Sequence, residues 1–284
     1  MEKINAYNHY TACISFPNGE TIFGRGFGYE GTSTGELCFN TAMTGYQEIL
    51  SDPSYAGQII LFTFPHIGNT GINNLDNESA TPSAVGIITR NMPSAPSNWQ
   101  SVGTLNHWLI EKKIIGIAEI DTRSLTRLLR NSGSQNIAIS YSKNKKINIE
   151  NTVNMAANAP GLEGKELANS VTTLKPYTWS EKSSSAVTDN QMKKNIKNIV
   201  AIDYGAKNNI FKCLRTLGFN ITVVPATTKF SKIMSYNPSG IFLSNGPGDP
   251  KATFSYTGPE LLRLLNETNL PIFGICLGHQ LLAL

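Results

Sequence analysis

The chain has 284 residues and a formal net charge of +4, with 40% hydrophobic and 15% charged residues. Domains commonly hold about 100–200 residues, so this length allows two domains. The lysines cluster at 143–146 and 193–197, in polar stretches rich in Asn and Ser, which indicates solvated segments and argues against nucleic-acid binding. No apolar run approaches the roughly 18–20 residues of a membrane span, so we expect no membrane association.

The cysteines Cys13, Cys38, Cys213 and Cys276 are widely spaced and form no CxxC pair. This spacing argues against a disulfide framework or a zinc site and is typical of a reducing compartment. The histidines are equally dispersed, so we expect no metal site. The first residues carry an early acid and lack the apolar core of a signal peptide, which predicts a cytoplasmic protein. A plastid origin stays open, although the short N-terminus does not resemble a transit peptide.

Residues 1–150 predict a mixed α/β domain. Two strands, at 10–16 and 21–27, flank the turn Pro-Asn-Gly-Glu, which favours a hairpin because Asn and Gly accept a positive φ at low cost. Further strands are predicted at 36–40, 58–64 and 85–89. One helix begins near Thr104, and another, capped by Asp121 or Thr122, ends before Gly133.

Residues 151–196 predict a linker with one short helix, because Pro, Gly and Ser interrupt a weak periodicity. From 197 to 284 short apolar strands alternate with helices, which predicts a doubly wound, mostly parallel sheet covered by helices on both faces. The expected strands are 199–202, 221–224, 241–244 and 272–275, and the expected helices are 208–217, 230–236, 259–265 and one from 277 or 278 onward. A doubly wound domain seldom ends inside such a helix, so we interpret this domain as incomplete and Leu284 as a truncation.

The stretch GICLGHQ, residues 274–280, has the G-x-nucleophile-x-G form of a strand-to-helix elbow. Glycines on both sides of Cys276 avoid Cβ clashes in a sharp turn. A helix N-terminus behind Cys276 would favour the thiolate, and the N–H of Leu277 would face the oxygen of a tetrahedral intermediate. The alternative is a buried structural cysteine, since free Cys is among the most buried residue types. The strand before the motif and the helix after it favour the nucleophile.

A second stretch, SNGPGDP at 244–250, follows the predicted strand 241–244. Ligands of open α/β sheets bind beyond the carboxyl ends of strands. Gly246 and Gly248 would let the backbone approach a ligand closely, although a plain turn would have a similar composition. Because both stretches leave the same edge of one sheet, together they favour a substrate pocket.

A cysteine nucleophile needs a histidine base, and His279 is the one histidine of residues 151–284. It lies only three residues after Cys276, so its side chain is expected to project away from the sulfur, and we do not assign it as the base.

At these residues the sequence resembles the class I glutamine amidotransferases, whose elbow reads G-x-C-x-G-x-Q. The first domain narrows the resemblance to the small subunits of carbamoyl phosphate synthetases. The matching motifs are NTAMTGYQE at 40–48, DPSYAGQ at 52–58, PHIGN at 65–69, PSNW at 96–99 and IDTRSLTR at 120–127. The resemblance covers essentially the whole chain.

The resemblance implies a heterodimer in which this subunit hydrolyses glutamine and a large subunit makes carbamoyl phosphate from the ammonia, bicarbonate and ATP, for arginine and pyrimidine synthesis. Cys276 matches the family nucleophile. Ser54, Gly246, Gly248, Leu277 and Gln280 match positions that hold glutamine, with Gly248 and Leu277 as oxyanion donors and Ser54 reaching over from the first domain. The chain itself would hold no cofactor, because ATP and Mg²⁺ would belong to the large subunit.

The histidine and glutamate that complete the family's catalytic triad are expected after the elbow, beyond residue 284. Two other interpretations therefore stay open. One is a different cysteine hydrolase or acyltransferase built on a similar elbow, which would leave the first domain and Gln280 without a role. The other is a catalytically inactive scaffold or regulatory subunit that binds the synthetase.

Overall fold

The computed structural model describes residues 10–180 and 197–284, which divide into two compact units. Unit 1 comprises residues 1–51 and 55–162, and unit 2 comprises residues 52–54 and 163–284. Three residues from the middle of the N-terminal half therefore belong to the C-terminal unit. Among the described residues, no helix is long and apolar enough to cross a membrane.

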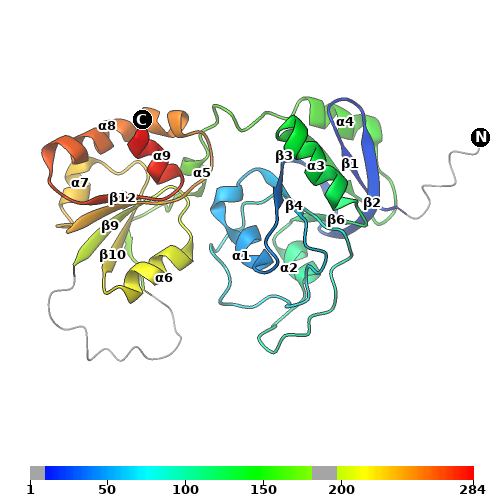
Figure 1. The fold of residues 1–284 in the computed structure, drawn as a ribbon, viewed down its shortest axis with the longest axis horizontal. Helices are drawn as coiled ribbons and strands as arrows, with labels where there is room; N and C mark the ends of the chain where they lie inside the picture. The colour runs from blue at the N-terminus through cyan, green and yellow to red at the C-terminus, as the bar shows by residue number, and fades with distance from the viewer. Residues whose placement is uncertain (1–9, 181–196) are drawn as a thin grey trace, which may run out of the picture. The chain divides into compact units, whose positions relative to one another are not determined.

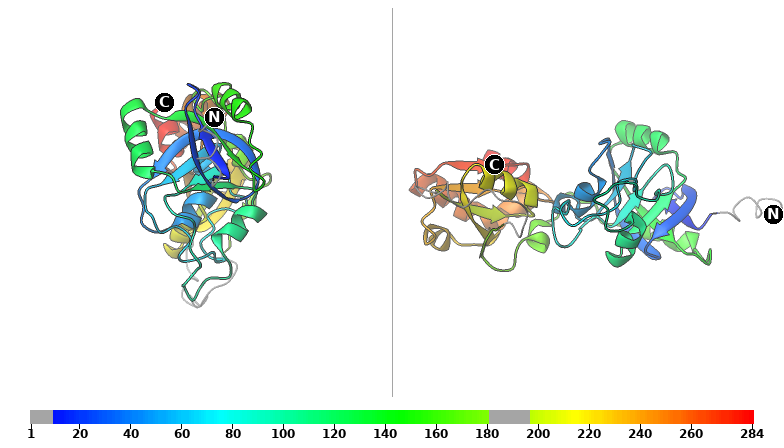
Figure 2. Two further views of the ribbon diagram at one scale, coloured as in Figure 1. Left: turned by 90° about the vertical axis from the view of Figure 1, so that its right-hand side faces the viewer. Right: turned by 90° about the horizontal axis from the view of Figure 1, so that it is seen from below.

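Unit 1 is built on a closed barrel with the strand order β1-β2-β6-β5-β4-β3-β7 (Figures 1 and 2). The strands are β1 (Ala12–Ser15), β2 (Thr21–Gly28), β3 (Gly31–Asn40), β4 (Gln58–Phe62), β5 (Gly86–Ile88), β6 (Ile115–Ala118) and β7 (Gln135–Tyr141). β3, β4, β5 and β6 run parallel to one another, and the remaining pairs are antiparallel. The predicted hairpin is confirmed, since Ser15 pairs with Thr21 across a turn in which Gly19 has a φ of +89°.

The strand β4 shows how the barrel is buried. Ile59 and Leu61 pack into one apolar cluster, while the alternate residues Ile60 and Phe62 pack into another. Side chains alternate across a strand, so a strand buried on both faces must be apolar at every position. The prediction that residues 58–64 form a buried strand is confirmed for 58–62.

Helices cover the barrel. They are α1 (Tyr46–Ser51), α2 (Leu105–Glu111), α3 (Thr122–Ser132) and α4 (Ile149–Ala157), with a 3₁₀ turn η1 at Pro53–Tyr55. The predicted caps of two helices are confirmed, because Thr104 Oγ1 accepts from the N–H of His107 and Asp121 Oδ1 accepts from the N–H of Ser124. α4 lies in the stretch expected as a linker, of which 181–196 falls outside the described residues.

Unit 2 contains a five-stranded sheet with the order β12-β11-β9-β10-β8. β9 (Asn198–Asp203), β10 (Asn220–Pro225), β11 (Gly240–Leu243) and β12 (Ile272–Gly274) are parallel, and β8 (Tyr177–Thr178) adds an antiparallel edge. The helices are α5 (Ala168–Val171), α6 (Asn208–Thr216), α7 (Phe230–Met234), α8 (Pro250–Glu267) and α9 (Leu277–Ala283). The predicted doubly wound, mostly parallel architecture is confirmed.

Helices cover both faces of this sheet. On one face, Ile241 and Leu243 of β11 pack with Leu261 of α8 and Leu277 of α9. On the other face, Phe242 of β11 packs with Phe211 of α6, where the two rings meet edge to face at 6.5 Å. The alternation along β11 thus separates two apolar cores.

The predicted start of α8 at Pro259 is wrong. The helix begins at Pro250, where Asp249 caps it by accepting from the N–H of Lys251. Proline is favoured at the first helical position, and Pro250 has this role. Pro259 lies inside the helix and removes one backbone hydrogen bond. The buried residues Thr253, Thr257, Leu261 and Leu264 hold the helix to the sheet on both sides of it.

A buried hydroxyl pair joins α4 to the barrel, so its loss is expected to destabilise unit 1. Ser15 Oγ lies 2.9 Å from Thr152 Oγ1, and Thr152 donates to the carbonyl of Ile149. Thr152→Val removes the acceptor for a fully buried serine and should lower the free energy of unfolding by about 1–2 kcal/mol. Urea unfolding followed by the fluorescence of Trp108, which is buried in unit 1, measures this change.

The matched control is Asn154→Ala, at an exposed position of the same helix. Equal stability of Thr152→Val and the wild type would show that α4 is not an integral part of unit 1.

Candidate active site

Cys276 stands at the turn between β12 and α9, where it is the N-cap residue of α9. Its backbone has φ 51° and ψ −111°, a combination that L-residues rarely adopt, and its side chain is exposed. Such a conformation costs about 1–3 kcal/mol and persists only where the surrounding structure enforces it. The predicted elbow is therefore present, and it holds its cysteine in a strained and accessible position.

Two glycines make this elbow possible because there is no room for a Cβ atom. A Cβ on Gly278 would lie 2.3 Å from the carbonyl oxygen of Leu243, and one on Gly274 would lie 2.6 Å from the backbone of Gly278. Neither glycine has a positive φ, so close packing, and not backbone conformation, requires them. The N–H of Gly278 donates to the carbonyl of Ser244 at 3.0 Å, which fixes the elbow against the end of β11.

The loop 244–250 begins at the same place. A Cβ on Gly246 would lie 2.1 Å from the carbonyl oxygen of Tyr204. Gly248 has a φ of +91°, and a Cβ there would lie 2.8 Å from the backbone of Leu167. Each predicted glycine is thus required by its contacts, and the loop has one conformation.

Asp249 holds the end of this loop. Its carboxylate accepts from the N–H of Gly164 at 2.9 Å and from the N–H of Lys251 at 2.8 Å. These hydrogen bonds, the first of them above all, lower the pKa of Asp249. The loop is therefore attached both to the segment before α5 and to the first turn of α8.

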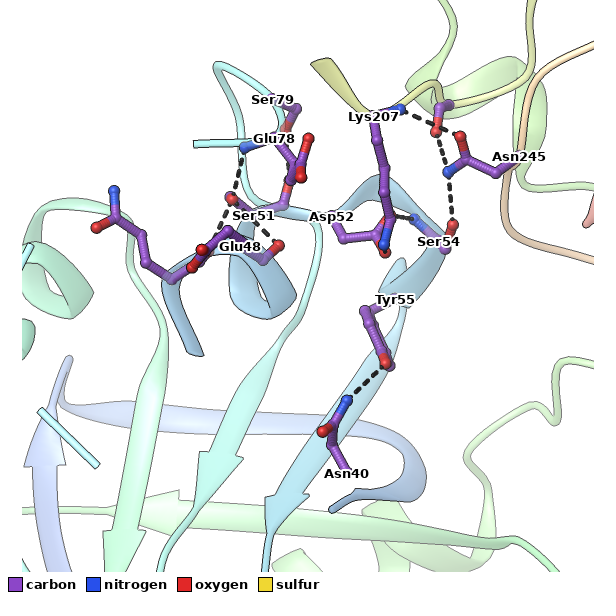
Figure 3. Close-up of polar contacts among 12 residues, drawn as sticks. Asn40, Glu48, Ser51, Asp52, Ser54, Tyr55, Glu78, Ser79, Lys207 and Asn245 are labelled. Atoms are coloured by element: carbon purple, nitrogen blue, oxygen red, sulfur yellow. Dashed lines mark hydrogen bonds and ion pairs between the residues drawn. The ribbon is translucent and has the colours of Figure 1, made fainter. Parts of the chain in front are cut away.

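Ser54 lies in the segment Asp52–Ser54, which belongs to unit 2. Asn245 Nδ2 donates to Ser54 Oγ at 2.9 Å (Figure 3). Asn245 Nδ2 also donates to the carbonyl of Gly205 at 2.9 Å, and Asn245 Oδ1 accepts from the N–H of Lys207 at 3.1 Å. A single buried amide therefore connects Ser54 with the loop that carries Gly246.

An ion pair fixes the same segment. Lys207 Nζ lies 2.8 Å from Asp52 Oδ2, and the Asp52 side chain is only 3% exposed (Figure 3). Asp52 Oδ1 accepts from the N–H of Ser54 at 2.9 Å. A buried carboxylate needs such a partner because its desolvation is costly. The position of Ser54 is thus set from both sides.

The residues predicted for the site are distributed as follows. Cys276 and Gln280 are exposed, and Leu277 is buried under α9. The elbow and the loop with Gly246 and Gly248 lie together at the carboxyl ends of β11 and β12. Asn245, Asp52 and Lys207 were not predicted. Asn245 lies within the glycine-rich stretch and could have been noticed there, whereas the pairing of Asp52 with Lys207 spans too much sequence to leave a local signal.

His279 is exposed on α9, and no structural contact assigns it to Cys276. Over the described ranges, 10–180 and 197–284, no group of three or more His, Cys, Asp or Glu side chains could hold a metal ion.

Comparison with known families supports both units. The family model for the class-I glutamine amidotransferases matches residues 200–284. Together with the strained cysteine elbow on a parallel sheet, this match places unit 2 in that class of domain. The family model for the CPSase domain of the carbamoyl-phosphate synthase small chain matches residues 14–139, most of the described part of unit 1.

Relatives match nearly the whole chain. A carbamoyl phosphate synthase small chain from Ruegeria pomeroyi is 45% identical over 281 residues, which cover 99% of this chain and 72% of the relative. Those from Zymomonas mobilis subsp. mobilis and Photorhabdus laumondii subsp. laumondii are 48% and 46% identical, over 94% and 96% of this chain and 72% and 71% of theirs. The chain belongs to the family of carbamoyl phosphate synthase small chains, which confirms the resemblance.

The strain at Cys276 makes a prediction about stability. Glycine adopts φ 51°, ψ −111° without the steric cost that a Cβ brings, so Cys276→Gly should be more stable than Cys276→Ala by about 1 kcal/mol. The free energy of unfolding of both variants, from urea denaturation, measures the difference.

Cys213 provides a matched control, because it is an exposed cysteine inside the regular helix α6. There glycine should be less stable than alanine by about 1 kcal/mol, which is the opposite sign. If glycine were the less stable substitution at both positions, the elbow would not be strained.

Proposed function

We propose that unit 2 hydrolyses glutamine with Cys276 as the nucleophile, and that the ammonia serves a large subunit that makes carbamoyl phosphate. The observation that carries this proposal is the exposed, strained cysteine next to the loop 244–250, in a member of the carbamoyl phosphate synthase small chain family. In such an elbow the nucleophile stands clear of the sheet while the next residue's N–H faces the same space.

In the first step the Cys276 thiolate attacks the side-chain amide carbon of glutamine. The amide oxygen becomes an oxyanion, for which the N–H groups of Leu277 and Gly248 are the proposed donors. The C–N bond then breaks, the nitrogen takes up a proton and leaves as ammonia, and a glutamyl thioester remains. Water hydrolyses the thioester to glutamate and restores the thiol.

The substrate would be held by Ser54, Gly246 and Gln280. Ser54 accepts from Asn245, so its own hydroxyl proton is available to a substrate carbonyl or carboxylate. Gly246 leaves its backbone uncovered by a side chain, and Gln280 is exposed one turn after Cys276. Residues of this chain would hold no cofactor, because ATP and Mg²⁺ would be bound by the large subunit, in a pathway to arginine or pyrimidines.

The departing ammonia needs a proton donor, and His279 is the one histidine of residues 163–284. We assign it no acid–base role, since it follows Cys276 directly on α9. Turnover of glutamine by residues 1–284 on their own should therefore be very low. A scaffold that binds the large subunit without hydrolysing glutamine is the second candidate function, and this lone histidine is the observation that favours it.

The nucleophile can be tested without turnover. A chloroketone analogue of glutamine should alkylate Cys276, detected by peptide mass spectrometry, and glutamine should protect against it. Cys276→Ser should abolish the labelling. In the complex with the large subunit, it should also abolish glutamine-dependent synthesis and leave ammonia-dependent synthesis unchanged.

Cys213→Ser is the matched control, because Cys213 is also exposed. It should leave the labelling intact. Labelling that is equal at Cys213 and Cys276, or that glutamine does not suppress, would remove the support for a glutamine site and favour the scaffold.

Ser54→Ala tests the substrate contact. The substitution removes the hydroxyl and leaves Asn245 its second acceptor, the carbonyl of Gly205. We expect the analogue concentration for half-maximal labelling to rise several-fold, with the melting temperature nearly unchanged. Thr228→Ala, a hydroxyl on another loop of unit 2, is the control. An unchanged concentration dependence in Ser54→Ala would limit Ser54 to a structural role.

A further inference from the structure

Unit 1 exposes four large apolar side chains in its loops: Met43, Leu75, Trp99 and Val102. Their exposed fractions are 71%, 51%, 89% and 67%, whereas the neighbouring Trp108 is 6% exposed. Single exposed apolar residues are ordinary, but a group of them around one opening marks an interaction surface. These four side chains are called the Trp99 patch below.

The patch surrounds a polar cavity of about 200 Å³. Met43 directly precedes the lining residue Thr44, Leu75 precedes Asp76, and Trp99 lies between Asn98 and Gln100. The cavity lining also includes Gly45, Tyr46, Gln47, Glu48, Thr70, Gly71 and Asn73. Apolar side chains therefore stand beside a hollow that is lined mainly by hydrogen-bonding groups.

The walls of the cavity are fixed before anything binds. Tyr46 Oη donates to the carbonyl of Gly71 at 2.6 Å and accepts from Thr70 Oγ1 at 2.9 Å. Gln47 Nε2 donates to the carbonyl of Asn73 at 2.6 Å, and Gln47 Oε1 accepts from the N–H of Asn73 at 3.0 Å. A preformed hollow loses little conformational entropy when a ligand group enters it.

The charge of the cavity is negative. Glu48 and Asp76 are its charged lining residues, and the lining contains no Lys, Arg or His. Within the described part of the chain, neither carboxylate takes part in an ion pair. Partial burial, with Asp76 and Glu78 nearby, raises the pKa of Glu48, as expected for a carboxylate that lacks a cation.

We propose that the Trp99 patch is a docking surface for the large subunit, with an Arg or Lys side chain of that subunit entering the cavity between Glu48 and Asp76. This inference rests on the proposed function for the existence of the partner. A small cation would satisfy the carboxylates but would leave Trp99 and Met43 in water. A polypeptide satisfies both, since a basic side chain fills the hollow while its neighbours cover the apolar residues.

The first experiment follows Trp99 directly. The chain contains three tryptophans, Trp99, Trp108 and Trp179, of which the last two are buried. The small subunit is labelled with 5-fluorotryptophan, and its ¹⁹F spectrum is recorded in H₂O and D₂O before and after addition of unlabelled large subunit. Trp99→Phe assigns the signal. The solvent isotope shift of Trp99 should be large in the free subunit and should disappear in the complex.

The second experiment measures affinity for the large subunit by isothermal titration calorimetry. Trp99→Ala should raise the Kd tenfold or more, as for an aromatic residue at the centre of an interface. Glu48→Gln and Asp76→Asn should each raise the Kd and weaken its dependence on salt, because each removes one charge facing the basic side chain. Leu128→Ala and Glu111→Gln, at exposed positions of α3 and α2, are the matched controls and should bind like the wild type.

The outcomes separate this inference from the proposed function. If the wild type binds the large subunit but Trp99 keeps its isotope shift and Trp99→Ala binds equally well, the patch is not the docking surface while the partnership stands. If the wild type does not bind at all, both fail. If the free subunit forms a dimer that Trp99→Ala dissociates, with binding to the large subunit unaffected, the patch covers a second copy of this chain and the inference is overturned.

Discussion

The candidate site depends on the close packing of the elbow against the end of β11. The N–H groups of Ile275 and Gly278 donate to the carbonyls of Leu243 and Ser244, on either side of Cys276. With both neighbours fixed, the backbone of Cys276 has no relaxed conformation available and adopts φ 51°, ψ −111°. The strain of about 1–3 kcal/mol is a sizeable part of the 5–15 kcal/mol by which proteins are commonly stable.

The short helix α9 compensates for this strain. It has seven residues, too few to be stable alone, and Leu277 and Leu281 anchor it in the core with exposed fractions of 1% each. Burial of two leucines contributes about 3–6 kcal/mol, which exceeds the cost of the elbow. The thiol remains accessible because both anchors point away from it into the apolar cluster of the sheet.

The sequence predicted unit 2 well and unit 1 only in part, for a physical reason. In unit 2 the order of strands and helices follows from local periodicity, because parallel strands buried on both faces must be apolar and must be joined by helices. The barrel of unit 1 closes by pairing β7 with β1 and β3, more than a hundred residues away in the sequence for β1. Such pairing leaves no local pattern. The strand β8 was missed because it has only two residues, both exposed.

In the candidate site, the sequence likewise predicted the residues whose role is local. Gly274, Gly278, Gly246 and Gly248 were recognised from their spacing, and the packing around each now explains why glycine is needed. Asn245 and the pairing of Asp52 with Lys207 were not predicted, since they depend on the insertion of three residues from the first half of the chain into unit 2.

That insertion gives the helix α1 a particular position. Met43 and Glu48 belong to the Trp99 patch and its cavity, and the segment Asp52–Ser54 follows α1 directly. α1 is held at its start by Tyr46 Oη and at its end by Ser51 Oγ, which donates to the carbonyl of Gln47 and accepts from the N–H of Glu78 (Figure 3). A helix fixed at both ends acts as a rigid spacer of six residues. A partner seated in the cavity would therefore also define the point from which the chain leaves for Ser54.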